Sequence, residues 1–470
     1  MLVDVTAVLT SPTLNSVGEA FGVPANSPLT IVAPAAPTAE QARWAALTEP
    51  VSNVLAAPGN DDPRAIPQAD PQGSRALTVL DGLTTLTSAQ LAEWAADPAA
   101  VASVVAAPPA ASAVADWWAG ADVGAKLRLL AAAPQVVGNL EGMPYGARDS
   151  ANRDVLADRI DALTQQIAEG SVGRAATEEL RAQLHMLQQV EAAIATGESG
   201  LPRTLVTLDV ADGGRAVIAV GDLATADYVS VLVPGMFYSV DSEITSWAGA
   251  ADQLAVDQAD WLARLTPAQH GANTRTVATV AWIGYQTPTV VNVASLDLAE
   301  AGRDALTASL RGIEAVRGEQ PQPYLTVLAH SYGATAALLA LQQNDITVDA
   351  LAMVGSPGSP AENVGQLRVR DGNVWVADAA LDPVASTGVF GSQPLSAAYG
   401  AHHFGVTGAT DPLTGRVLAG SVGHVDYFTT GSESFRNMAL IGIDRGAYVI
   451  DTDGVMAAAS RALSSASSWR

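Results

Sequence analysis

Two patterns of hydrophobic residues alternate in the second half of the chain. Short runs of apolar and β-branched residues predict buried strands, and stretches with apolar residues three or four positions apart predict helices between them. The predicted strands are residues 204–210, 215–220, 228–233, 277–283, 324–329, 349–354 and 374–377. The predicted helices between them are residues 242–265, 297–317 and 332–343. Strands separated by helices predict an α/β fold with a mostly parallel, doubly wound sheet covered on both faces.

The first two predicted strands differ from the others in how they are connected. Asp212, Gly213 and Gly214 lie between them, and such a turn sequence is typical of a β-hairpin. We therefore expect the sheet to begin with antiparallel strands and to continue as a parallel body.

The N-terminal half has a different pattern. Residues 1–111 are rich in alanine and proline, with short helices expected at 38–48 and 88–96. Between residues 151 and 195 the apolar positions have helical spacing with one break at 170–173, which predicts a helical hairpin. The predicted parts are an Ala/Pro-rich helical or partly irregular N-terminal region at 1–111, a helical segment containing the hairpin at 112–200, and the α/β domain at 201–470.

Charge and cysteine content narrow the partners and the chemistry. The 470 residues include 24 Lys and Arg against 48 Asp and Glu, which gives a net charge of −24, and Lys126 is the single lysine. This charge argues against nucleic acid as a partner, because phosphate binding needs a basic patch. The sequence has no cysteine, which excludes disulfides, thiolate metal sites and a cysteine nucleophile.

Hydropathy gives the expected location. No uninterrupted apolar run reaches the roughly 18 residues that a transmembrane helix needs, and the N-terminus lacks the basic region of a signal peptide. The default expectation is therefore a cytoplasmic protein without a membrane span, with export by a non-standard route left open. The sequence does not indicate an oligomeric state.

The segment A-H-S-Y-G at 329–333 carries the strongest candidate chemistry. It joins a predicted strand to a predicted helix, which is the context that a nucleophile elbow requires. The residues two before and two after the nucleophile must be small there, and Ala329 and Gly333 satisfy this. We therefore expect Ser331 to be the nucleophile, at the N-terminus of a helix whose dipole favours an oxyanion. The structural alternative is that Ser331 only caps the helix.

A serine nucleophile needs a general base, and the chain has six histidines. His330 is expected to be structural, since its side chain must point away from the serine at a tight turn. His185 and His270 are expected at the surface, and His402–His403 lack a third ligand for a metal site. His424 follows the predicted strands, and in this kind of fold the chain order is serine, acid, histidine. It is therefore the predicted base.

The acid is expected in the loop after the second strand beyond the elbow, where the sequence offers Asp378 and Asp382. We favour Asp382, because it lies further into the loop and can reach a histidine from another loop. Asp378 stays an alternative, and Asp426 is too close to the histidine in sequence to orient it easily. The acid would hold one tautomer of the histidine and stabilise its protonated form.

The oxyanion hole is expected at two backbone amides. The strand at 228–233 leads into Pro234 and Gly235, so the amide of Met236 is one expected donor, and that of Tyr332 is the other. The adjoining residues Gly235, Phe237 and Tyr238 are predicted to contact substrate, although aromatic residues there are as often plain packing.

These residues belong to a longer series of motifs. The segments are G-N-L-E-G-M-P (138–144), R-D-S-A-N-R (148–153), A-V-G-D (219–222), V-L-V-P-G-M (231–236), A-W-I-G-Y (281–285), A-H-S-Y-G (329–333), V-G-S-P-G (354–358), D-P (382–383), G-H-V-D-Y-F (423–428) and G-S-E-S-F-R-N (431–437). In them the chain resembles an alpha/beta hydrolase family of high-GC bacteria long carried as a domain of unknown function. The resemblance covers about residues 112–445. It implies an alpha/beta hydrolase fold and a triad of Ser331, Asp382 and His424, and it supplies no substrate.

The sequence thus predicts a serine hydrolase that cleaves an ester, thioester or amide of a small-molecule acyl substrate through an acyl-enzyme, with no cofactor or metal. We also expect the segment containing Met143 and Asn152 to pack over the catalytic end of the sheet as a lid or pocket wall. The alternative function is a non-catalytic binding or export-linked interaction protein. That alternative rests on the triplet W-A-G at 118–120 and 247–249, which is short enough to occur by chance.

Overall fold

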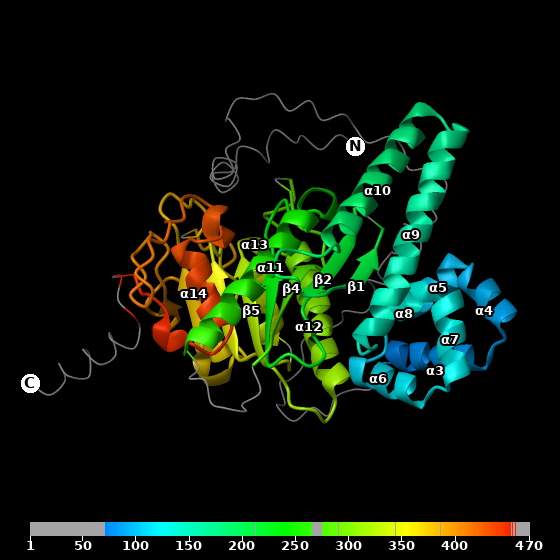
Figure 1. Cartoon of the computed structure of the whole chain (residues 1–470), viewed down its shortest axis with the longest axis horizontal. Helices are drawn as coiled ribbons and strands as arrows, with labels where there is room; N and C mark the ends of the chain where they lie inside the picture. Colours follow the sequence, from blue (N-terminus) through cyan, green and yellow to red (C-terminus); the bar gives the residue numbers. More distant parts are fainter. Residues whose placement is uncertain are drawn as a thin grey trace, which may run out of the picture.

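The computed structural model describes residues 71–456, except 212, 266–274, 290, 344, 386, 453 and 455. The predicted helix at 38–48, residues 1–70 of the predicted N-terminal region, Asp212 and His270 lie outside the described residues. Figure 1 shows a central sheet with helices on both faces and a group of smaller helices at one end.

An eight-stranded sheet forms the centre of the molecule, in the order β1-β2-β4-β3-β5-β6-β7-β8. The strands are β1 (Arg203–Asp209), β2 (Arg215–Val220), β3 (Tyr228–Val233), β4 (Val277–Ile283), β5 (Tyr324–His330), β6 (Ala350–Val354), β7 (Val374–Ala377) and β8 (His402–His403). β2 pairs antiparallel with β1 and β4, and the remaining pairs are parallel. The antiparallel start and parallel body confirm the predicted fold, an alpha/beta hydrolase fold. β8 was not predicted.

Two hydrophobic cores hold the sheet between helices. The inner strands are buried on both faces, as expected for continuous apolar runs in a parallel sheet. One core contains side chains of α10 (Arg174–Ala193), α11 (Val240–Leu265) and α14 (Glu433–Ile441). The other contains side chains of α12 (Asp297–Arg317) and α13 (Tyr332–Gln343). The helices predicted at 297–317 and 332–343 have the observed bounds, whereas α14 was not predicted.

Smaller helices precede the sheet and form a third hydrophobic core, which runs from Leu80 to Ala151 and so continues across residue 111. They are α3 (Pro71–Thr85), α4 (Ser88–Ala95), α5 (Pro98–Val105), α6 (Ala111–Gly120), α7 (Val123–Ala132) and α8 (Pro134–Asn139). The predicted division at 111 and 200 stays a prediction. Four short 3-10 helices lie in the C-terminal loops, at Val364–Gln366, Arg370–Gly372, Asp426–Phe428 and Gly446–Tyr448.

The predicted helical hairpin is present. It consists of α9 (Tyr145–Glu169) and α10, with Gly170 at φ 60° where the first helix ends. The end of the hairpin that carries this turn extends away from the sheet, while the other end lies beside β1 (Figure 1). The hairpin therefore packs against the β1 side of the sheet, opposite the C-terminal loops that follow β7.

Candidate active site

Ser331 lies in a tight turn between β5 and α13. Its φ of 55° is in the left-handed region, which residues other than glycine rarely adopt. Ala329 is fully buried, and a Cβ atom on Gly333 would lie 2.3 Å from the carbonyl oxygen of Pro234. A Cβ atom on Gly235 would lie 2.5 Å from that of Ser331, so only glycine fits there. The strand, strained turn and helix have the geometry expected of a nucleophile elbow, and the role of Ser331 as the nucleophile stays a prediction.

Ser331, His424 and Asp382 form a continuous hydrogen-bonded chain, which we call the nucleophile edge. His424 Nε2 lies 2.6 Å from Ser331 Oγ, although the two residues are 93 positions apart. His424 Nδ1 lies 2.9 Å from each carboxylate oxygen of Asp382. A carboxylate can only accept, so Nδ1 carries the proton and Nε2 is free to accept the serine hydroxyl proton. All three residues are buried.

Two paired loops bring the acid and the histidine together. The loop after β7 contains Asp382, and the loop before α14 contains His424. The Gly423 amide donates to the Ala380 carbonyl at 2.9 Å, and Ala380 forms a parallel bridge with Val422. The backbone pairing holds the two loops side by side and so keeps the two side chains within hydrogen-bonding distance.

The surroundings of Asp382 favour its ionised form. Burial alone would raise the pKa of Asp382. Hydrogen bonds from His424, Tyr427 and the Val384 amide act in the opposite direction, as does the charge of His424, and together they outweigh burial. The pKa of Asp382 is therefore lowered from its ordinary value. A group that stays ionised can support a protonated histidine without taking its proton.

Tyr427 is a buried neighbour of Asp382, the predicted acid, and the sequence analysis did not identify this tyrosine. Its hydroxyl donates to Asp382 Oδ2 at 2.5 Å and accepts from the Ala379 amide at 2.8 Å. It thus connects the carboxylate to the backbone at the start of the same loop. Its position in the motif G-H-V-D-Y-F, three residues after His424, is the sequence feature that could have indicated this residue.

The structure distinguishes the two acid candidates. Asp378 Oδ1 is buried and has no hydrogen-bond partner among the described residues. Burial and the negative charge of Asp382 raise the pKa of Asp378 to about 6. The side chain that hydrogen-bonds to His424 is that of Asp382.

His330 forms a hydrogen bond with the backbone of His424, the predicted base. Its Nε2 lies 2.7 Å from the carbonyl oxygen of His424, so this nitrogen carries the proton and donates. Burial and the neighbouring His424 lower the pKa of His330 to about 3, which keeps its ring neutral. The structural role expected for His330 therefore agrees with its contacts.

The two amides expected to form the oxyanion hole have no competing partner. Neither the Met236 amide nor the Tyr332 amide donates a hydrogen bond to another described residue. Tyr332 opens α13, so its amide is one of the free donors at the start of that helix. Both residues adjoin Ser331. Met236 follows Gly235, which packs closely on Ser331, and Tyr332 is the next residue after Ser331 along the chain.

The remaining predicted contact residues differ in exposure. Phe237 is 48% exposed and has a φ of 67°. Tyr238 packs its ring at 4.9 Å from Trp247 and 6.0 Å from His330, measured between ring centroids. Tyr238 therefore lies in an aromatic cluster beside His330, and its contact with substrate stays a prediction.

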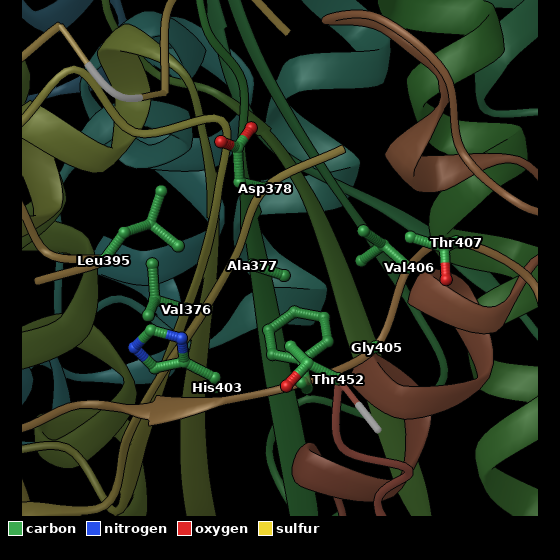
Figure 2. A pocket seen from close by; sticks show the side chains of 10 residues that line it. Val376, Ala377, Asp378, Leu395, His403, Gly405, Val406, Thr407 and Thr452 are labelled. Atoms are coloured by element: carbon green, nitrogen blue, oxygen red, sulfur yellow. The ribbon is translucent and has the colours of Figure 1, made fainter. Parts of the chain in front are cut away.

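The other described histidines lie elsewhere. His185 is exposed on α10, and His402 and His403 form β8. His403 lines a cavity of about 210 Å³ beside β7 and β8, together with Asp378 and mainly apolar side chains. Figure 2 shows the Asp378 carboxylate directed away from His403. No group of three or more His, Asp or Glu residues within the described part of the chain could hold a metal ion.

The prediction of a lid from residues 138–153 is wrong. These residues form a polar cluster, which we call the β1 clamp: Glu141, Arg148, Asp149 and Asn152. Asn152 Nδ2 donates to the carbonyl of Leu205 in β1 at 3.0 Å, and Met143 is fully buried in the N-terminal helical core. β1 is four strands from β5, or about 19 Å at the usual strand spacing.

The contacts of the β1 clamp explain why its residues lie there. Arg148 pairs with Glu141 at 2.5 Å and donates to Thr207 of β1 at 3.0 Å. Asp149 accepts the Leu205 amide at 2.6 Å. These bonds fasten α8 and α9 to an edge strand, so the motif residues have a structural role far from the serine.

Comparisons with known proteins establish the family. A family model described as alpha/beta hydrolase matches residues 209–392, which include Ser331 and Asp382 and end before His424. The uncharacterized protein Rv0963c of Mycobacterium tuberculosis is 32% identical over 201 residues, which cover 41% of this chain and 73% of that protein. The chain belongs to the alpha/beta hydrolase family.

One longer relative and one solved structure are also similar to this alpha/beta hydrolase. The uncharacterized protein Rv2079 of Mycobacterium tuberculosis is 27% identical over 386 residues, covering 73% of this chain and 56% of Rv2079. The hydrolase thus spans only about half the length of that relative. A solved esterase from Pyrobaculum calidifontis aligns at 12% identity with a TM-score of 0.33, over 60% of this chain and 97% of that one. Within the described residues, no helix is long and apolar enough to cross a membrane.

Proposed function

We propose that this alpha/beta hydrolase is a serine hydrolase that cleaves an ester-type bond through an acyl-enzyme on Ser331. The observation that carries the proposal is the hydrogen-bonded chain from Asp382 through His424 to Ser331 Oγ, with the serine in the strained turn between β5 and α13. Membership of the family supports hydrolysis in general, and the geometry supports acyl transfer to serine.

In the first half of the reaction, Ser331 Oγ attacks the substrate carbonyl while His424 Nε2 takes its proton. The carbonyl oxygen becomes an oxyanion, and the amides of Met236 and Tyr332 stabilise it. His424 then gives its proton to the departing alcohol, thiol or amine, and the acyl group stays on the serine. Asp382 stays ionised throughout and stabilises the protonated histidine.

In the second half, a water molecule takes the place of the leaving group. His424 removes a proton from the water, which attacks the acyl-serine carbonyl through a second tetrahedral intermediate. The serine oxygen leaves with the proton from His424, and the free acid is released. Each proton movement in both halves passes through one nitrogen, so the hydrogen bond between His424 and Ser331 is the centre of the mechanism.

The test is a fluorophosphonate label together with turnover of p-nitrophenyl acetate and butyrate. Wild type is expected to label and to hydrolyse these esters, and Ser331→Ala is expected to lose both. Ser246→Ala is the matched control, because Ser246 is exposed on α11 and its hydroxyl hydrogen-bonds to Glu243. A folded wild type that neither labels nor hydrolyses any ester would contradict the proposal and favour the non-catalytic alternative.

A further inference from the structure

Large apolar side chains are exposed on the loops that carry the nucleophile edge. Leu381 is 85% exposed, Val425 68%, Val422 55% and Phe237 48%. We call these four residues the apolar rim. Scattered single apolar residues on a surface are ordinary, but four on the loops of one candidate site are not.

Each residue of the apolar rim lies within two positions, along the chain, of a residue of the proposed mechanism. Leu381 directly precedes Asp382, and Val422 and Val425 lie on either side of His424. The backbone bridge between Ala380 and Val422 brings these two loops together. Phe237 follows Met236 and lies two residues after Gly235, which packs on Ser331. The loops after β3 and β7 and the loop before α14 therefore carry both the apolar rim and the residues of the proposed mechanism.

Backbone strain distinguishes two members of the apolar rim. Leu381 has a φ of 65° and Phe237 a φ of 67°, both in the left-handed region that disfavours large side chains. Leu381 is 85% exposed, so packing within the described residues offsets little of its strain. Strained residues that gain little from burial are typical of ligand contacts rather than of the core.

The size and charge of the surroundings indicate what kind of molecule binds. A stable protein partner usually covers 20–30 residues, far more than the four of the apolar rim. An anionic membrane surface would be repelled by a chain with a net charge of −24. A single uncharged hydrocarbon chain fits both observations.

We propose that the apolar rim binds the extended acyl chain of a single, uncharged ester substrate, so that the enzyme prefers medium-length chains to acetate. The inference rests on the proposed function, which it deepens by naming the substrate class. Contact with the apolar rim removes hydrocarbon from water, and each methylene contributes a favourable free energy.

The first test compares kcat/KM for p-nitrophenyl octanoate and acetate, with the octanoate kept below its critical micelle concentration. Wild type is expected to prefer octanoate, and Leu381→Asn and Phe237→Asn are each expected to lower the octanoate-to-acetate ratio by roughly tenfold. Asparagine is chosen because it tolerates the left-handed conformation. The ratio also separates chain binding from damage to Asp382, since a defect in the acid slows both esters alike.

The matched control is Leu127→Gln, on α7 in the N-terminal helical region, which removes another exposed apolar side chain. It is expected to leave the ratio unchanged. An unchanged ratio in both rim variants would overturn the proposal, as would a wild type that hydrolyses acetate without preferring octanoate. Rates that increase only above the critical micelle concentration would instead show that the occupant is a lipid aggregate, and would also overturn it.

A second test does not depend on turnover. Octan-1-ol is titrated into the full chain by calorimetry at several temperatures, with ethanol as the short control. Octan-1-ol is expected to bind with a negative heat-capacity change, the mark of apolar burial, and to bind several-fold more weakly to both rim variants. If octan-1-ol binds in this way while no ester is hydrolysed, the proposed catalysis fails and the apolar binding site stands. If octan-1-ol does not bind, the inference fails even where the esterase assay succeeds.

Discussion

The nucleophile edge is a buried polar cluster and the β1 clamp a largely buried one, and both are built from motif residues, yet they differ in how their hydrogen bonds end. In the β1 clamp, the side chains end on backbone groups of α8 and β1, on the Thr207 side chain or on a partner of opposite charge. In the nucleophile edge, the chain of bonds ends on the hydroxyl of Ser331. The β1 clamp fastens two helices to a strand, whereas the nucleophile edge has the arrangement that the proposed reaction needs.

Strain separates the two regions as well. Five described residues other than glycine have a positive φ, and three of them lie at the nucleophile edge or on its apolar rim: Phe237, Ser331 and Leu381. None lies in the β1 clamp. The difference teaches that a high density of motif residues does not by itself locate an active site. Backbone strain combined with exposed apolar side chains is the feature that distinguishes the proposed site from the β1 clamp.

The largest expected effect is on the acid. Asp382→Asn is expected to lower kcat by roughly 10³- to 10⁴-fold, because the amide cannot stabilise the protonated histidine and favours the wrong tautomer. Asp378→Asn is the neighbouring control and is expected to stay within about threefold of wild type, since it has no hydrogen bond to the base. The measurement is kcat for p-nitrophenyl butyrate. Equal losses in the two variants would show that the loop, and not the acid, had been disturbed.

The next effect concerns stability in the β1 clamp. Arg148→Ala is expected to cost about 3–5 kcal/mol in the free energy of unfolding, because it leaves Glu141 without its buried partner. Its kcat for the folded protein is expected to be unchanged. Urea unfolding measures the first, and an ester assay on purified folded protein measures the second.

The control for Arg148 is another arginine in an ion pair. Arg174→Ala breaks the pair with Glu178 on α10, where both side chains are exposed, so the cost is expected to stay below about 0.5 kcal/mol. A loss of kcat in Arg148→Ala with full stability would remove the distinction between the β1 clamp and the nucleophile edge.

Most of the fold could be predicted from the sequence because its inner strands are continuous apolar runs between helices of regular spacing. β4 has the predicted bounds, as do α12 and α13. β8 could not be predicted, because two histidines show no alternation and form a strand only by pairing with β7. α14 was missed because its buried face includes the polar residues Glu433, Arg436 and Asn437, whose partners come from other loops.

The candidate site was predictable where chemistry constrains local sequence. A tight elbow requires small residues at fixed positions, so Ala329 and Gly333 pointed to Ser331. The position of residues 138–153 depends instead on bonds to β1, more than fifty residues later in the chain, and no local pattern carries that information. Tyr427 was missed for the same reason, since its partner Ala379 is 48 positions away.

A smaller effect is expected from the tyrosine that holds the acid. Tyr427→Phe removes the donor to Asp382 and leaves the Ala379 amide unpaired, so kcat is expected to fall about tenfold. The hydrogen bond from Tyr427 lowers the pKa of Asp382, so its loss raises that pKa and moves the acidic limb of the kcat/KM profile to higher pH.

The pH profile separates positioning by Tyr427 from a purely structural role. Tyr399→Phe is the matched control, because Tyr399 is buried and its hydroxyl has no hydrogen-bond partner among the described residues. Its profile is expected to coincide with that of wild type. A fall in kcat for Tyr427→Phe with no movement of the acidic limb would assign the residue to loop packing alone.

The smallest effect is expected from Asp378, which lines the cavity in Figure 2 and lies near the charge of Asp382. Its pKa is raised to about 6 in the folded protein, mainly by burial, so between its ordinary pKa and that value the folded state binds more protons than the unfolded state. Stability contributed by this group is therefore present at low pH and is lost as the pH rises through about 6. Asp378→Asn is expected to be about 1 kcal/mol more stable than wild type at pH 7.5 and to match wild type near pH 3.5. The expected difference is small because the side chain is half-buried and its charge is partly screened by solvent. Urea unfolding at the two pH values measures the difference, and a variant that is less stable than wild type at both would show that the carboxyl group forms a needed hydrogen bond in the folded protein.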